Sequence, residues 1–413
     1  MAAVNSTPTD SEALVKDFLD SNPQLASDLG EIQVMTDRYT NQEWERQIRE
    51  TQKKVVVNEG EKGARRYLAP AVGSREFAET VDHTLLKLDA TTKQIDALCA
   101  EARTEGFKSV CVRLNHVSRC ISNLKGTSVV VACVVGFHEG IQDTYSKLLE
   151  ARAAVAAGAS ELDIVLNHSI LTANSSTPTS SPPPQQQPQT LHKRDSTADT
   201  ITWRNTEANS KPTNGSQPAS GPYSVSAPGS STSARSSSSR TETGDHVPET
   251  DISDYSAIYR ELASLRSLCP APTTLKLILE TSQLSSPQIL AAAHLAAAAN
   301  FDFIKTSTGF NGPGATLPDV QLMVAAAEYL STRTKSNAGS PVRAGGGRMQ
   351  VKASGGIRSL EDAVRMLEAG ASRLGTSSGL WIMQEARARV EEGQTRRPSP
   401  VSRLYTDDSV EDY

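Results

Sequence analysis

The chain is predicted to fold as an α/β protein of the (β/α)8 TIM-barrel class, and three observations support this. Two blocks, 76–172 and 252–390, alternate short apolar runs with amphipathic helical segments. Together they contain eight strand and helix units over roughly 230 residues, close to the size of such a barrel. Polar residues close the apolar runs, where a barrel places its active site. A doubly wound open sheet is the alternative, because periodicity alone cannot show closure.

Each strand is predicted from a run of β-branched and apolar residues, and each helix from the signals at its ends. The predicted strands are 81–86, 109–112, 129–135, 161–166, 275–279, 303–306, 350–353 and 373–375. Gly106, Gly158, Asn300 and Gly370 end helices, because a left-handed residue is favoured at that position. The segment 359–362 fits a capping box, which starts a helix.

The barrel halves are flanked and interrupted by segments of different composition. Residues 1–75 are predicted to be an N-terminal appendage, partly helical or disordered. Residues 173–251, between the fourth and fifth strands, are rich in Ser, Thr, Pro and Gln. Such a tract cannot bury enough apolar area to offset its chain entropy, so a disordered insertion is predicted. Residues 391–413 are predicted to be a disordered tail.

The composition favours a small-molecule substrate. The net charge of the 413 residues is −5 and long blocks of like charge are absent, which argues against nucleic acid or a membrane surface as partner. No apolar run approaches about 18 residues and the N-terminus has no apolar core, so a cytoplasmic protein is expected. The five cysteines form no C-x-x-C pair and the histidines lack ligand spacing, so no metal site is predicted.

Two lysines at the ends of neighbouring predicted strands, Lys305 and Lys352, are the main chemical signal. If both point into one pocket, each makes the other harder to protonate. A neutral amine is what imine formation with a carbonyl requires. The alternative for each is a lysine whose stem lies on the barrel and whose head reaches solvent.

Other strand ends carry further polar residues. Asp163 faces the same side as Asn167 and could pass protons near the amines; it could also serve only as an ion-pair partner. Asp82 and Thr84 close the first strand, and Lys276 and Glu280 close the fifth.

Two loops rich in Gly and Ser, 354–356 and 375–379, follow the seventh and eighth predicted strands. Backbone amides next to a helix N-terminus form a cradle for an anion, and barrels often place a phosphate there. Plain tight turns between strand and helix remain the alternative.

Four segments together resemble the deoxyribose-phosphate aldolase family: 82–86, 161–167, 303–310 and 351–358. The resemblance covers both barrel blocks in order. It implies a cofactor-free class I aldolase on a β/α barrel, which cleaves 2-deoxy-D-ribose 5-phosphate to D-glyceraldehyde 3-phosphate and acetaldehyde in deoxyribonucleotide catabolism. A homodimer is a possible assembly.

The resemblance also implies roles for individual residues. Lys305 would form the Schiff base, and Asp163 and Lys352 would donate and accept protons. The implied substrate-binding residues are Asp82, Thr84, Gly309, Gly355, Gly356, Ser377 and Ser378.

The sequence departs from the family pattern at 113–115 and 138–140, in the loops after the second and third strands, and in the long insertion. Two other interpretations therefore stay open. One is an imine-forming aldolase for another sugar phosphate. The other is a weakly active barrel that recruits partners through its insertion.

Overall fold

The computed structural model describes most of the two predicted barrel halves and part of the N-terminal segment. The described residues are 10–26, 29, 32, 34–55, 67–173, 252–332 and 347–395. All of them belong to one compact unit. Apart from Ala173, the predicted insertion lies outside the described residues, and so does the predicted tail beyond Thr395.

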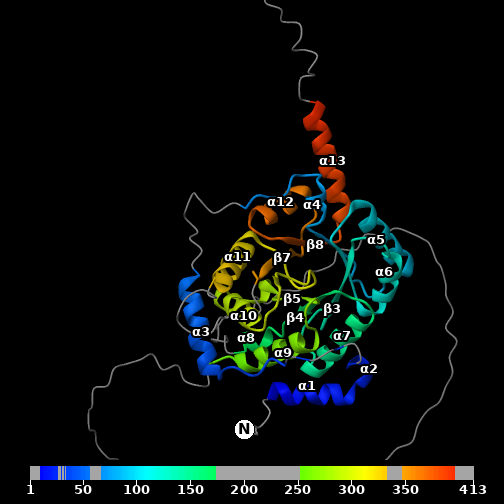
Figure 1. Ribbon diagram of the computed structural model, residues 1–413. Helices are drawn as coiled ribbons and strands as arrows, with labels where there is room; N and C mark the ends of the chain where they lie inside the picture. The colour runs from blue at the N-terminus through cyan, green and yellow to red at the C-terminus, as the bar shows by residue number, and fades with distance from the viewer. Residues whose placement is uncertain are drawn as a thin grey trace, which may run out of the picture. The chain divides into compact units, whose positions relative to one another are not determined.

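Eight parallel strands close into a barrel in chain order, with β8 pairing to β1 (Figure 1). The strands are β1 (Val81–Thr84), β2 (Ser109–Val112), β3 (Val130–Val135), β4 (Glu161–Val165), β5 (Thr274–Ile278), β6 (Phe303–Lys305), β7 (Gln350–Ser354) and β8 (Arg373–Thr376). The predicted barrel is confirmed, and the closed ring of pairings excludes the open sheet. Each strand lies within two residues of its predicted ends.

Helices surround the strands (Figure 1). In the barrel blocks they are α4 (Arg75–Ala78), α5 (Thr92–Glu105), α6 (Val117–Asn123), α7 (Thr144–Ala156), α8 (Ser169–Thr172), α9 (Tyr255–Leu268), α10 (Ser286–Ala298), α11 (Leu317–Thr332), α12 (Leu360–Glu368) and α13 (Gly379–Thr395). Two 3-10 turns, η1 (Leu114–His116) and η3 (Thr281–Gln283), precede α6 and α10. The capping box of α12 is formed by Ser359 and Asp362, and Gly106 ends α5 in the left-handed conformation, as predicted.

The strand register decides which polar side chains meet inside the barrel. Lys305 pairs with Lys352 across β6 and β7, and Asp163 pairs with Lys276 across β4 and β5. Because side chains on a strand alternate between its two faces, residues in register at inward positions lie side by side in the interior. The fold therefore brings these four ionisable groups to one level of the barrel.

The N-terminal segment contributes α1 (Asp10–Ser21), α2 (Pro23–Ala26) and α3 (Asn41–Lys54). Helix α1 packs on α9, and α3 packs on α10 and α9. Phe18, Trp44 and Ile48 are fully buried by this packing, and the Trp44 ring centre lies 4.8 Å from that of Tyr259. The predicted domain boundary at residue 75 stays a prediction, but the described part of this segment covers the outer wall of the barrel.

Helix α13 continues to Thr395, past the boundary predicted at residue 390. Glu391 and Glu392 are strong helix formers, and a helix that has started adds residues at little further free-energy cost.

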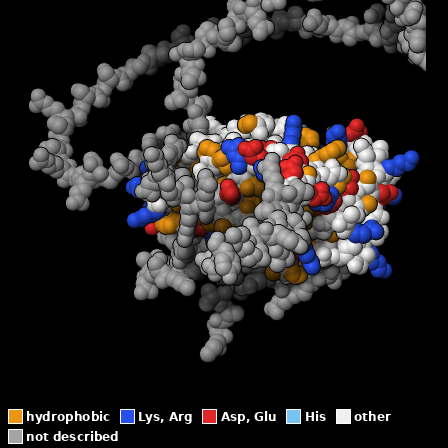
Figure 2. All heavy atoms as spheres, turned by 90° about the horizontal axis from the view of Figure 1, so that it is seen from above, with side chains coloured by type: hydrophobic (Ala, Val, Ile, Leu, Met, Phe, Trp, Pro, Cys, Tyr) orange, Lys and Arg blue, Asp and Glu red, His pale blue; other side chains and the backbone are white. Residues whose placement is uncertain are grey.

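The surface of the described residues carries charges of both signs. Figure 2 shows Lys and Arg side chains interspersed with Asp and Glu side chains on the face that it presents. Among the helices of the described ranges, none is both long enough and apolar enough to cross a membrane.

Replacing Trp44 by alanine tests the packing of α3. We expect Trp44→Ala to lower the free energy of unfolding by about 3–5 kcal/mol, because a buried aromatic side chain leaves a cavity. Trp381, which is 66% exposed on α13, provides the matched control, and Trp381→Ala should change stability by less than about 0.5 kcal/mol. Equal effects in urea titrations of the two variants would contradict the packing described here.

Candidate active site

Much of the barrel interior is filled by charged side chains. Barrel interiors are usually filled by layers of bulky branched apolar residues, so this composition is unusual. All seven side chains are buried. The basic ones are Lys276, Lys305, Lys352 and Arg373, and the acidic ones are Asp82, Glu161 and Asp163.

Asp163 is the centre of this network. Its Oδ2 accepts hydrogen bonds from Lys305 Nζ and Lys352 Nζ, both at 2.8 Å, and its Oδ1 accepts one from Lys276 Nζ at 2.7 Å. Burial opposes ionisation of Asp163, but the three amines outweigh it and hold the pKa of the carboxyl well below its usual value. Asp163 is therefore a carboxylate that links the two lysines predicted from sequence.

Asp82 forms the second node. Its Oδ2 accepts a hydrogen bond from Lys352 Nζ at 2.5 Å, and its Oδ1 accepts from Arg373 Nη1 at 2.5 Å and Ser109 Oγ at 2.7 Å. Burial disfavours the charge on Asp82, but Lys352 and Arg373 together keep its pKa below the usual value. The structure thus places Asp82 as a counter-ion of Lys352. Thr84 donates to the backbone carbonyl of Asp82 at 2.9 Å.

Among the four basic groups, Lys305 differs from the other three. Burial lowers the pKa of Lys305, and the nearby charge of Lys352 lowers it further against the attraction of Asp163. Burial also disfavours the charged forms of Lys276, Lys352 and Arg373, but their carboxylate partners outweigh it and raise their pKa values.

The charge count of the network agrees with this difference. Three carboxylates face four basic side chains. If Lys305 is neutral, three positive charges meet three negative ones, which is the state that a buried network favours, since an uncompensated buried charge is costly. Lys305 is therefore the amine of this network whose neutral form is most favoured.

The part of the interior wall that β2 and β3 form is apolar. Leu86, Cys111, Ala132 and Val134 form a small cluster against which Phe137 packs. Burial raises the pKa of the Cys111 thiol to about 11, and the Asp163 carboxylate acts in the same direction. The thiol therefore stays protonated at neutral pH.

The loops after β6, β7 and β8 are joined to one another. Ala315 N donates to Gly355 O at 3.0 Å, and a Cβ added to Gly355 would lie 2.8 Å from the Cα of Gly314. Thr376 Oγ1 donates to Ile357 O at 2.7 Å, which ties the β8 loop to the β7 loop. These contacts hold three backbone segments at the mouth of the barrel.

Five of the residues predicted to bind substrate lie on these joined loops. Gly309, Gly355 and Gly356 all have positive φ, so a side chain at any of them would be strained. Ser377 is exposed, and Ser378 precedes α13, where its carbonyl accepts the first helical hydrogen bond, from Ile382 N at 3.0 Å.

The loops that depart from the family pattern meet at the mouth. The Phe310 ring centre lies 5.1 Å from that of Phe137 and 5.2 Å from that of His138, against which it is stacked. Arg113 lies over the Phe137 ring at 5.0 Å. The altered segments after β2 and β3 therefore form, with Phe310, an aromatic group beside the site.

Sequence reasoning missed part of the network. Lys276 was noted as a strand-end residue but was given no role, although its register with Asp163 makes it a direct partner. Glu161 and Arg373 begin their strands, whereas the sequence criterion selects polar residues at strand ends. Their signal was alternation, since Glu161 lies on the same strand face as Asp163.

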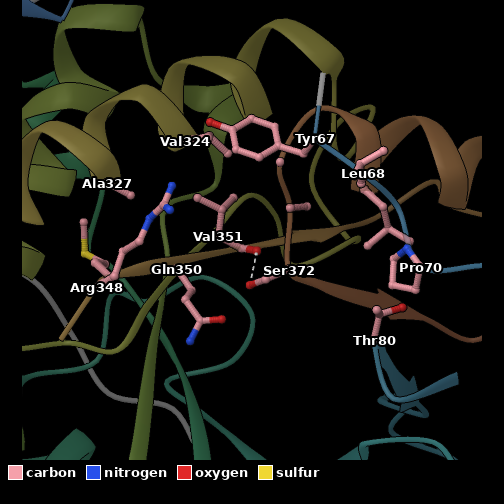
Figure 3. A pocket seen from close by; sticks show the side chains of 14 residues that line it. Tyr67, Leu68, Pro70, Thr80, Val324, Ala327, Arg348, Gln350, Val351 and Ser372 are labelled. Carbon is pink, nitrogen blue, oxygen red and sulfur yellow. Dashed lines mark hydrogen bonds between the residues drawn. The ribbon is translucent and has the colours of Figure 1, made fainter. Parts of the chain in front are cut away.

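A cavity of about 530 Å³ opens at the other end of the barrel, at the amino ends of β7 and β8 (Figure 3). Its lining includes Tyr67, Arg348 and Gln350 but none of the predicted site residues. Tyr67 and Arg348 both bond to Glu328. In the part of the chain that the structure describes, no group of three His, Cys, Asp or Glu residues is placed to hold a metal ion, and metal-free chemistry stays a prediction.

Comparison with known proteins gives the family that the four sequence segments resemble. A deoxyribose-phosphate aldolase of Coccidioides immitis (strain RS) is 36% identical over 321 residues, which is 78% of this chain and 84% of that protein. The chain belongs to the deoxyribose-phosphate aldolase family. The relative of that name from Bdellovibrio bacteriovorus is 33% identical over 309 residues, 75% of this aldolase and 96% of its own length.

Solved structures agree with this assignment. One from Coccidioides immitis, which carries the same family name, has a TM-score of 0.58 at 33% identity and covers 85% of this aldolase and 100% of its own chain. The aldolase QR15 has a TM-score of 0.50 at 28% identity, over 76% of this chain and 97% of its own. No family model matches the chain. The predicted family, fold and enzyme class are confirmed, while the roles of individual site residues stay predictions.

Replacing Lys352 by methionine tests the coupling between the two amines. Because the Lys352 charge lowers the pKa of Lys305, Lys352→Met should raise that pKa and protonate Lys305 at neutral pH. Borohydride traps the imine that acetaldehyde would form with Lys305. The rate of this trapping should then reach half of its maximum at a higher pH. The rate at pH 7 should fall about a hundredfold or more, since the proton-transfer role is also lost. Lys352→Arg keeps the charge, so the midpoint pH of its trapping rate should equal that of the wild-type protein. An unmoved midpoint in Lys352→Met would contradict the coupling.

Proposed function

We propose that this protein cleaves 2-deoxy-D-ribose 5-phosphate to D-glyceraldehyde 3-phosphate and acetaldehyde through a Schiff base on Lys305. The observation that carries the proposal is one buried lysine whose pKa is lowered, hydrogen-bonded to a carboxylate that also contacts a second lysine. Membership of the aldolase family supports the substrate.

The reaction needs a nucleophile and a route for protons. Neutral Lys305 adds to the C1 carbonyl of the open-chain sugar, and the carbinolamine then loses water to give the iminium ion. A base removes the proton from the C3 hydroxyl, the C2–C3 bond breaks, and the electron pair moves into the iminium to form an enamine. Glyceraldehyde 3-phosphate leaves. Protonation of the enamine at C2 and addition of water then release acetaldehyde and Lys305.

We assign the movement of these protons to Asp163 and Lys352. Asp163 Oδ2 lies 2.8 Å from each of the two amines, so it can take a proton near Lys305 and exchange it with Lys352. The pKa directions set the resting charge states of the pair, because they keep Asp163 as a carboxylate and Lys352 as an ammonium. Lys276 and Arg373 remain as fixed counter-ions.

The phosphate is assigned to the joined loops after β6, β7 and β8. Gly309, Gly355 and Gly356 leave backbone amides uncovered by side chains, and α13 adds the positive end of a helix of 17 residues behind Ser378. The sugar carbons would then extend from these loops to Lys305 along the apolar wall that contains Phe137. The homodimer and the cytoplasmic location remain predictions from sequence.

Trapping with borohydride tests the proposal. Reduction in the presence of 2-deoxyribose 5-phosphate, followed by peptide mass mapping, should place a two-carbon or sugar adduct on Lys305. Lys305→Met should lose turnover by a factor of about 10⁴ or more, because covalent catalysis is removed. Lys87→Met, at an exposed position after β1, is the control and should keep wild-type turnover. An unmodified Lys305 under turnover conditions would overturn the Schiff-base assignment.

A screen of donors and acceptors separates this substrate from other sugar phosphates. A higher kcat/KM for another aldehyde or ketose phosphate than for 2-deoxyribose 5-phosphate would replace the substrate but keep the imine chemistry.

A further inference from the structure

Glu280 has a backbone conformation that its residue type disfavours. It follows β5 with φ +57° and ψ +62°, in the left-handed region. Among the described residues other than glycine, only Glu280 and Asn300 have positive φ. Asn300 ends α10, where asparagine is a common left-handed residue. No such rule accounts for Glu280, and a left-handed residue with a Cβ costs about 1–2 kcal/mol. Strain of this kind persists where the surroundings enforce it, often at functional sites.

The side chain of Glu280 gives a reason for the strain. It is fully buried, and its Oε2 accepts a hydrogen bond from Thr308 Oγ1 at 2.5 Å. Thr308 N lies 3.3 Å from Oε2 and 3.4 Å from Oε1. The carboxyl group therefore accepts hydrogen bonds from both the hydroxyl and the backbone N–H of Thr308, in the loop after β6. A glycine at position 280 would relieve the backbone but could not make these contacts.

Neighbouring residues attach the same two loops at further points. Thr281 N donates to Thr306 O at 3.0 Å, and Ser282 Oγ donates to Asn311 O at 2.8 Å. The Thr308 hydroxyl in turn accepts a hydrogen bond from Phe310 N at 3.1 Å. The β5 loop thus fixes the β6 loop on both sides of Gly309.

These hydrogen bonds between the two loops fix the position of Gly309. It follows Thr308 directly, and a Cβ added to Gly309 would lie 3.7 Å from the Cα of Gly355. Gly309 and Gly355 are two of the three glycines assigned above to the phosphate. A displacement of Thr308 would therefore move one side of the phosphate cradle, whereas Lys305 is held separately by β6 and Asp163.

We propose that Glu280 is a positioning residue for the phosphate: its buried carboxyl group fixes Thr308, so that the Gly309 amide faces the anion. The inference rests on the proposed phosphate site. It assigns Glu280 no contact with substrate and no part in proton transfer. Burial raises the pKa of Glu280, and the hydrogen bonds from Thr308 act in the opposite direction.

The test compares substrates with and without the phosphate. Glu280→Gly should lower kcat/KM for 2-deoxyribose 5-phosphate by about ten- to a hundredfold, through KM, as expected for lost hydrogen bonds to a charged group. It should change kcat/KM for unphosphorylated 2-deoxyribose by less than about threefold, because Lys305 keeps its position. The inhibition constant of inorganic phosphate should rise by the same factor as KM.

Matched variants separate positioning from stability. Glu280→Gln keeps the length and one acceptor oxygen, so it should restore most of the preference for the phosphorylated sugar. Thr308→Val removes the hydroxyl, and with it the hydrogen bonds to Glu280 and from Phe310 N, but keeps the backbone donor. It should show the same selective loss as Glu280→Gly to a smaller extent. Asn300→Gly makes the same backbone change away from the cradle and should leave the substrate ratio unchanged.

The outcomes distinguish the two proposals. Equal loss on both sugars, or a wild-type ratio in both Glu280→Gly and Thr308→Val, would overturn the role of Glu280 alone. A wild-type enzyme that does not discriminate between the sugars and is not inhibited by inorganic phosphate would overturn the phosphate site, and the role of Glu280 with it.

Discussion

The buried ion-pair network around Asp163 is the constraint on which the site depends. Its three carboxylates and four basic side chains come from β1, β4, β5, β6, β7 and β8, so it forms only when the barrel closes. Desolvating each ion costs several kcal/mol, and only partners in good geometry offset this. With four basic side chains and three carboxylates, a fourth positive charge would have no carboxylate of its own. The network therefore favours a neutral form of one amine, and Lys305 is the lysine whose pKa burial and the Lys352 charge lower.

This constraint divides the barrel into regions with separate tasks. In the proposed mechanism, the charged network holds Lys305 and passes protons through Asp163, and the apolar wall around Phe137 would keep water from the reacting carbons. The joined loops at the mouth are built from backbone and small residues, so they can approach an anion closely. The Glu280 contact links these regions, because it joins the end of β5, beside the network, to the loop that carries Gly309.

Much of this was predictable from sequence, for identifiable reasons. The strands are short β-branched runs bounded by glycine, so their positions could be read, whereas closure rests on the pairing of β8 with β1 and could not. The sequence criterion of polar residues near the ends of predicted strands, where barrels have their active sites, finds Lys305, Lys352 and Asp163. Glu161 and Arg373 lie at strand starts; alternation places Glu161 on the face of Asp163, but its contact with Arg373 follows only from the structure. Glutamate disfavours the left-handed conformation, so residue preferences would not have predicted it at Glu280. The predicted insertion lies outside the described residues.

The protonation state of Lys305 in the resting enzyme tests the central claim most directly. Protein labelled with 13C at lysine Cε can be titrated by NMR, with the Lys305 signal assigned by its loss in Lys305→Met. We expect Lys305 to titrate below the ordinary lysine pKa, and Lys276 and Lys352 to titrate above it. A Lys305 signal that remains protonated up to or beyond the ordinary lysine pKa would contradict the charge balance from which the mechanism is derived.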